Sequence, residues 1–335
     1  MLRFMVLVSS VLVLGGCGSS GPAGSGGGGG SCPNVPFASL PMPDALFAAG
    51  QRNLLALDDT RLFSTTPDNY VLAIPKSGGE EVIIGQGNTY EGLTAGASDL
   101  YLSAVGDVIL RLAKDGTSQS QIADQQLGAA SASQGITTDD AHVYWLGEGL
   151  LPIDASPPTM GFLRRSDLDG GNIVDLATGL RAPASLLVDG GLAIWAEQST
   201  GGLDSIEPPD GAIHTVPVAG GPVTTLVSGL ATPLVRAHRD GFVWFGGGAD
   251  LYRVPDTGGT PTLMVPGAAQ SAIGATNVFW VELVASAQRT ILLRAPITGG
   301  CATPIALVDG AFSPLAIDDT TVYVAMPEGV LAVKQ

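Results

Sequence analysis

Acidic side chains gather in two segments, 147–160 and 198–210, that interrupt an otherwise repeating pattern. Both segments fall between the second and third strands expected in their repeats, so we expect them side by side on one face. Segments inserted into repeats often build the binding face of a repeat protein. Neutral variation in loop length is the alternative interpretation. The residues expected to form this acidic binding face are Glu148, Asp154, Asp204, Glu207 and Asp210.

Familiar catalytic and cofactor signatures are absent from the sequence. It contains no His-Glu-x-x-His, Cys-x-x-Cys or Gly-x-Ser-x-Gly motif, and no Walker or dinucleotide-binding loop. His142, His214 and His238 fall at different positions of different repeats, and a lone histidine on a strand is more often packed or solvated than catalytic. Residues 167–172 resemble a calcium loop but lack its final Glu. We predict no catalytic residue, no metal site and no cofactor.

Seven copies of one pattern make up most of the chain. Each copy has a short apolar strand, a second strand with an aromatic or β-branched centre, a third strand, and a fourth strand after a glycine turn. The centres are 36 to 50 residues apart. They are Phe63, Tyr101, Tyr144, Ile194, Val243, Phe279 and Tyr323.

Four short strands per unit at this period are typical of a β-propeller blade. We therefore predict an all-β fold over residues 34–335, a seven-bladed β-propeller of four-stranded antiparallel blades, with six or eight blades as the alternative. The seventh copy ends at Gln335, before its fourth strand. Residues 45–49 supply that strand in our prediction, so that an N-terminal strand closes the ring and leaves no open edge.

Two known families share parts of this pattern. Tyr144-Trp145, Arg165 and the Asp169-Gly170 turn resemble the YWTD-type propeller repeat, best over residues 136–179. The final Asp of that motif is at best replaced by Glu197 or Glu282. The Val-Tyr-Trp and Val-Pro-x-x-Gly-Gly blocks are similar to those of bacterial β-propeller lipoproteins. That resemblance implies an architecture and a location but no activity.

The N-terminal residues are typical of an exported lipoprotein. Residues 1–16 have a basic start and an apolar run too short to span a bilayer, which predicts a signal peptide. Leu14-Gly15-Gly16-Cys17 resembles a lipobox, which implies lipidation of Cys17; an ordinary signal cut nearby is the alternative. Residues 17–33 form a Gly/Ser-rich flexible tether in our prediction. Gly18 in place of Asp implies the outer membrane, on its periplasmic face or at the cell surface.

The number of cysteines limits the possible disulfides, and the net charge limits the classes of binding partner. If Cys17 carries lipid, Cys32 and Cys301 remain as a pair in an oxidising compartment, so we expect a disulfide, with two free thiols as the alternative. The net charge of −16 argues against nucleic acid or an anionic membrane surface as a partner, so we expect no nucleic acid. Membrane contact is expected through the lipid anchor only.

Comparison of the copies with one another suggests contacts between blades. Arginines on third strands alternate with aspartates that end the first strand of the following copy, which predicts interblade ion pairs. The equally weighted alternative is that each Asp closes its own turn through the backbone. The expected pairs are Arg111 with Asp139, Arg165 with Asp189, and Arg294 with Asp318. Arg253 faces Gly274 and breaks the pattern.

All four tryptophans of the chain share one repeat position: Trp145, Trp195, Trp244 and Trp280. A recurring position favours packing between blades over a ligand surface.

These observations favour a lipid-anchored extracytoplasmic binding or scaffold module for an envelope protein or a small ligand. The alternative is a propeller enzyme, a lyase or a glycan-active hydrolase, with its site at the central channel. Fold alone does not exclude that activity.

Overall fold

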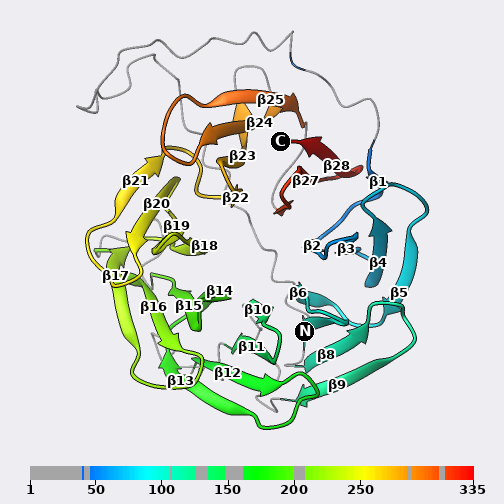
Figure 1. Ribbon diagram of the computed structural model, residues 1–335, viewed down its shortest axis with the longest axis horizontal. Helices are drawn as coiled ribbons and strands as arrows, with labels where there is room; N and C mark the ends of the chain where they lie inside the picture. Colours follow the sequence, from blue (N-terminus) through cyan, green and yellow to red (C-terminus); the bar gives the residue numbers. More distant parts are fainter. Residues whose placement is uncertain are drawn as a thin grey trace, which may run out of the picture.

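Seven four-stranded antiparallel sheets form a ring around a central axis (Figure 1). The computed structural model describes residues 40, 46–105, 108–124, 135–147, 161–199, 208–284, 289–308 and 314–335. Over these residues the regular secondary structure consists of strands β1 to β28. The all-β class, the seven blades and their four-stranded antiparallel form are therefore confirmed.

Each blade runs outward from the axis in chain order. Blade 1 holds β2 (Leu54–Leu57), β3 (Arg61–Thr65), β4 (Tyr70–Pro75) and β5 (Val82–Gln86), and blade 2 holds β6 (Tyr90–Ala95), β7 (Asp99–Ala104), β8 (Val108–Ala113) and β9 (Gln119–Asp124). Blade 3 holds β10 (Gly135–Thr138), β11 (His142–Gly147), β12 (Gly161–Asp167) and β13 (Val174–Leu180). Blade 4 holds β14 (Pro183–Asp189), β15 (Leu192–Glu197), β16 (Gly211–Pro217) and β17 (Thr224–Leu230).

The remaining blades follow the same order until the ring closes. Blade 5 holds β18 (Leu234–Arg239), β19 (Phe242–Gly247), β20 (Asp250–Pro255) and β21 (Thr262–Val265). Blade 6 holds β22 (Ser271–Ile273), β23 (Asn277–Val284), β24 (Arg289–Pro296) and β25 (Thr303–Leu307). Blade 7 holds β26 (Leu315–Ile317), β27 (Thr321–Met326) and β28 (Gly329–Lys334), and β1 (Ala48–Ala49) is its outer strand.

The N-terminal strand closes the ring as the sequence predicts. Ala48 pairs with Val330 and Ala49 with Gly329. Two further backbone hydrogen bonds extend the pairing, from Phe47 N to Val330 O at 2.7 Å and from Gly50 N to Glu328 O at 2.6 Å. Blade 7 is therefore built from both ends of the propeller.

A recurrent turn explains the Val-Pro-x-x-Gly-Gly blocks. After β16, the N–H of Gly220 donates to the carbonyl oxygen of Pro217 at 2.8 Å, and Gly220 has a φ of +92°. That backbone conformation suits glycine because it has no Cβ. The same bond joins Gly78 to Pro75, Gly258 to Pro255 and Gly299 to Pro296. Each turn sends the chain from the third strand to the outer strand.

The core lies between the blades. Tyr144 and Leu146 of blade 3 pack with Trp195 of blade 4 in one buried cluster. All four tryptophans are at most 2% exposed, which confirms packing as their role. The indole nitrogens of Trp145 and Trp280 have no hydrogen-bond partner among the described residues, although buried indoles usually have one. Leu40, from the N-terminal region, packs into the blade 5 and 6 cluster with Trp244.

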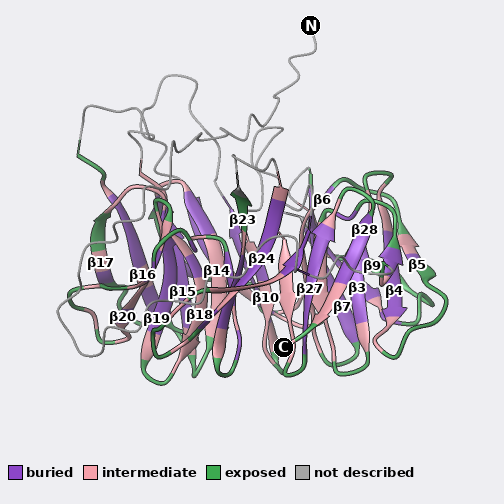
Figure 2. Ribbon diagram, turned by 90° about the horizontal axis from the view of Figure 1, so that it is seen from above, coloured by how far each residue is buried: buried purple, intermediate pink, exposed green. Residues whose placement is uncertain are grey.

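The ring has two distinct faces. We call the face where second strands lead into third strands the insertion face, because both inserted segments begin and end there. The opposite face, called the turn face, carries the glycine turns and the C-terminal residue Gln335 (Figure 2). In the described part of the chain, no helix has the length and apolar character needed to cross a membrane.

Candidate functional site

The insertion face at blades 3 and 4 carries the part of the predicted acidic face that the structure describes. Asp210, just before β16, is among the described residues. The four other expected members, Glu148, Asp154, Asp204 and Glu207, lie outside them. The candidate site is therefore built from Asp210 and its described neighbours.

Asp210 is held by partners from both flanking connections. Arg181, which links blade 3 to blade 4, places Nη1 3.0 Å from Asp210 Oδ2. Ser199 Oγ donates to Asp210 Oδ1 at 3.0 Å, and the Asp210 N–H returns a bond to Ser199 Oγ at 3.2 Å. Ser199 and Asp210 are the described ends of the blade 4 insertion, so this network fixes the base of that segment.

Glu197 and His214 lie next to this network. The Glu197 Oε2 to His214 Nε2 distance is 3.9 Å, and their side chains are only 11% and 14% exposed. His214 stacks on Trp195 with ring centroids 5.4 Å apart, and its Nδ1 lies 3.1 Å from Thr225 Oγ1. His214 Nε2 has no hydrogen-bond partner among the described residues.

Burial moves both groups toward their neutral forms. Removal from water raises the pKa of Glu197, and the nearby backbone N–H and charge of Arg181 offset only part of that rise. Burial also lowers the pKa of His214, and the charge of Arg181 adds to the effect. The pair therefore combines a carboxyl group that holds its proton unusually well with an imidazole that resists protonation. That combination can accept and donate hydrogen bonds to a polar ligand.

The backbone is strained in the connection between blades 3 and 4 and near the start of β14. Ala182 has a φ of +41° and Ser185 a φ of +42°, which side-chain-bearing residues rarely adopt. Surrounding bonds hold both in place: Gln198 N donates to Ala182 O at 3.0 Å, and Val235 N donates to Ser185 Oγ at 2.8 Å. Such conformations persist only where neighbouring structure enforces them, and they cluster at functional sites.

No sequence motif marks Arg181, Ser199, Glu197 and His214 as parts of one site. Glu197 was noted only as a replacement for the last YWTD residue. Its register partner Ala212 lies two residues before His214, so both side chains point to the same side of blade 4. The strand register would have revealed the pair, but an insertion of 13 residues between β15 and β16 hides that register in the sequence.

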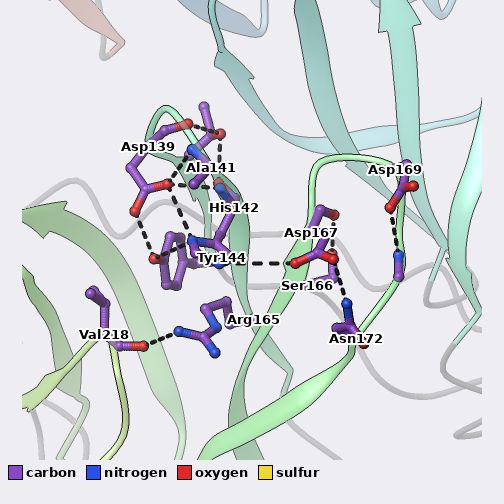
Figure 3. A network of polar contacts seen from close by, with 12 residues as sticks. Asp139, Ala141, His142, Tyr144, Arg165, Ser166, Asp167, Asp169, Asn172 and Val218 are labelled. Carbon is purple, nitrogen blue, oxygen red and sulfur yellow. Dashed lines mark hydrogen bonds and ion pairs between the residues drawn. The ribbon is translucent and has the colours of Figure 1, made fainter.

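On the turn face, the aspartates expected in ion pairs mostly close their own turns (Figure 3). Asp139 Oδ1 accepts hydrogen bonds from the N–H groups of Ala141 and His142 at 2.8 and 2.7 Å. Its Oδ2 accepts one from the hydroxyl of Tyr144 at 2.7 Å. Burial raises the pKa of Asp139, but these bonds outweigh it, so the pKa falls below its usual value. Asp318 Oδ1 likewise accepts from the backbone of Thr320 and Thr321, both at 2.9 Å.

The expected arginines have other partners. Arg111 pairs with Asp99 of its own blade at 2.8 Å, where Asp139 was expected. Arg165 Nη1 crosses to blade 4 but donates to the carbonyl oxygen of Val218 at 2.5 Å, where Asp189 was expected (Figure 3). Arg294 forms no ion pair within the described residues. Three hydrogen bonds, from Tyr144 and from two turn N–H groups, already hold the carboxylate of Asp139 in its own turn.

Interblade ion pairs do occur, in the opposite direction along the chain. Lys114 of blade 2 lies 2.8 Å from Asp58 of blade 1, and Lys76 of blade 1 lies 2.9 Å from Asp318 of blade 7. In the same direction, His238 Nδ1 of blade 5 lies 2.7 Å from Asp189 Oδ2 of blade 4. The carboxylate thus comes from the earlier blade in the ring and the basic group from the next one.

Cys301 forms a disulfide. The other two cysteines of the chain, Cys17 and Cys32, lie outside the described residues, so the pairing with Cys32 remains a prediction. The expected signal peptide and tether lie there too. Among the described residues, no three or more His, Cys, Asp and Glu side chains gather in a way that would hold a metal ion.

Comparison with known proteins identifies the fold. No protein-family model and no curated protein matches the chain. A solved structure of a nidogen/laminin complex matches 74% of this chain and 93% of its own, at 14% identity and a TM-score of 0.53. An oligogalacturonate lyase in complex with manganese matches 85% and 97%, at 10% identity and a TM-score of 0.60. YCF48 bound to a D1 peptide matches 88% and 99%, at 12% identity and a TM-score of 0.56. At these identities the likeness shows the propeller fold alone.

Proposed function

We propose that this chain is a lipid-anchored extracytoplasmic binding module that takes an envelope protein or a small ligand on its insertion face at blades 3 and 4. The proposal rests on the Arg181–Asp210–Ser199 network at the base of the blade 4 insertion. Charged and polar groups are concentrated there beside Glu197 and His214. A closed ring holds these groups in fixed positions, which reduces the ordering cost of binding.

Two structural neighbours support binding as the activity. The nidogen/laminin structure is a protein complex, and YCF48 was solved with a peptide. The resemblance of the blades to bacterial propeller lipoproteins supports the location, with Cys17 as the lipidated residue and the outer membrane as the destination. The net charge of −16 disfavours nucleic acid and anionic lipid surfaces as partners.

Site-specific cross-linking tests the binding face. A photoreactive residue is placed at exposed Pro208 on the insertion face, and in a control chain at exposed Ser77 on the turn face. With both full-length chains in their own membrane, we expect covalent adducts from position 208 and none from position 77. Adducts from neither position, or equally from both, would contradict the proposal.

Metabolic labelling tests the anchor. We expect a radioactive fatty acid to be incorporated into the wild-type chain and not into Cys17→Ala, which should leave the membrane fraction. A Cys17→Ala chain that still carries the label would show that the anchor is elsewhere.

An enzyme remains the second candidate because of one observation, the Glu197–His214 pair. A buried carboxyl group with a raised pKa beside an imidazole with a lowered pKa has the composition of an acid and base pair. The lyase among the structural neighbours shows that this fold hosts such chemistry. Turnover of uronate oligomers by the wild-type chain, abolished in Glu197→Gln and His214→Gln, would establish it. Undiminished turnover in both variants would exclude this pair.

A further inference from the structure

A small cavity on the turn face opens between blades 5 and 6. Its volume is 260 Å³, and it lies on the opposite side of the ring from the proposed binding face. Its lining residues are Arg239, Asp240, Phe242, Trp244, Arg253, Ile297 and Thr298. The lining formally carries one net positive charge, from two arginines and one aspartate, in a chain of net charge −16.

Arg253 is held in place by aromatic rings and not by an acid. Its guanidinium carbon lies 4.4 Å from the ring centroid of Phe242 and 5.6 Å from that of Trp244. Contact with ring faces restrains the guanidinium plane and leaves its N–H groups to bond along its edge. Arg253 forms no hydrogen bond or ion pair with the described part of the chain, and its Nε is buried without a partner. Arg253 lines the cavity, so an acceptor that enters the cavity can reach its guanidinium group.

Neighbouring residues do not supply that partner. Blade 6 has Gly274 where blades 1, 3, 4 and 7 have a turn aspartate, and a Cβ at Gly274 would lie 2.9 Å from Ile317 Cδ1. Arg239 uses Nη1 on the carbonyl oxygen of Gly274 and Nε on Asp240 at 3.2 Å. Asp240 is therefore already engaged, and it is 79% exposed. An acceptor for Arg253 therefore has to come from outside the boundary between blades 5 and 6.

We propose that this cavity binds the carboxylate of a small acidic molecule or of a chain end, with the guanidinium of Arg253 as a bidentate donor. A fork of parallel N–H donors matches the two coplanar oxygens of a carboxylate. The single net positive charge of the lining balances a monoanion. The volume is below the ~300 Å³ at which ordinary ligand pockets begin, so it fits one acidic group at the end of a ligand.

Calorimetry on the full-length chain in detergent tests the site with defined probes. N-acetylglycine represents a peptide chain end and glucuronate a sugar acid, while N-acetylglycinamide and glucose are their neutral counterparts. We expect the acids to bind with a Kd on the order of 1 mM and the neutral probes not to bind. Tighter binding of N-acetylglycine assigns a chain end, and tighter binding of glucuronate assigns a sugar acid. Equal binding of acids and neutral probes, or tighter binding of inorganic phosphate, would overturn the assignment.

A matched pair of variants localises the binding. Arg253→Lys keeps the charge but loses the fork, and we expect a loss of affinity of about tenfold, as for one charge-assisted hydrogen bond. Arg294→Lys changes the same repeat position in blade 6, and Arg294 does not line this cavity, so the variant should bind like the wild type. Thermal unfolding followed by circular dichroism checks that both variants fold. Unchanged affinity in a folded Arg253→Lys chain would refute the proposal.

Discussion

Lys76 Nζ lies 2.9 Å from Asp318 Oδ2 and joins the first blade of the ring to the last. The backbone closure of the ring consists of the two-residue strand β1 and the hydrogen bonds of Phe47 and Gly50 that flank it. The side chains of Lys76 and Asp318 are mostly buried, at 16% and 22% exposed, so the pair is shielded more than a surface ion pair. The ion pair therefore supplements the backbone closure at the seam where the ring has its shortest strand.

Removal of this pair should loosen the closure. In a double-mutant cycle with Lys76→Met and Asp318→Asn, we expect a coupling energy of about 1 kcal/mol in the free energy of unfolding, from urea denaturation. The control is Arg164 and Asp175, which pair at 2.5 Å within blade 3. That pair is more exposed and spans no seam, so its coupling should be below about 0.5 kcal/mol. Equal coupling for the two pairs would contradict a special role at the seam.

Acid should weaken the fold through the same carboxylate. Burial raises the pKa of Asp318, but Lys76 and the N–H and hydroxyl of Thr320 outweigh burial and bring the pKa to about 2. Because the folded pKa is below the ordinary value of 3.8, ionised Asp318 stabilises the fold above pH 3.8. That contribution is lost as the pH falls from 3.8 toward about 2. Asp318→Asn should therefore show a shallower loss of stability across this interval than the wild type, measured by urea denaturation at each pH; parallel profiles would show that Asp318 is not responsible.

Blade number and closure were predictable because they depend on local chemistry. A glycine turn, an aromatic strand centre or a missing last strand can each be recognised from a few adjacent residues. Gly220 is such a case, since its positive φ and its bond to Pro217 belong to one four-residue turn. The burial of the tryptophans between blades was predictable from their shared repeat position, but its direction was not. Trp195 and Trp280 pack toward the preceding blade. Trp244 lies opposite Arg253 in the strand register and packs toward the following blade, blade 6.

Interblade partners were not predictable in this way. The partner of a carboxylate at a blade boundary depends on how the two blades are placed relative to each other. The spacing of residues along the chain does not indicate that placement. Asp58 pairs with Arg61, three residues away, but also with Lys114, 56 residues away, and spacing along the chain does not indicate the second partner. The candidate site was partly visible through Asp210, but its partner Arg181 lies in a connection with no motif.

Gly329 should be indispensable for ring closure. A Cβ at this position would lie 1.9 Å from the carbonyl oxygen of Ala48, which is backbone of the closing strand and has little room to move. We expect Gly329→Ala to lower the free energy of unfolding by about 3 kcal/mol or more. Gly299→Ala is the control, because its φ of +93° is strained for alanine but a Cβ there meets nothing within 4 Å. It should cost about 1 kcal/mol, and a Gly329→Ala chain no less stable than this control would contradict the role of the close approach.

The disulfide of Cys301 should tie the N-terminal region to blade 6 through Cys32. If Cys17 is acylated, Cys32 is the only other cysteine in the chain. Cys32→Ser and Cys301→Ser should then each lower the free energy of unfolding by about 2–4 kcal/mol, because the cross-link restricts the unfolded chain. The double variant should lose no more than either single one, since both remove the same bond. Peptide mapping without reductant gives an independent readout: a linked pair containing Cys32 and Cys301 is expected, and a linked peptide containing Cys17 would overturn both the pairing and the lipid anchor.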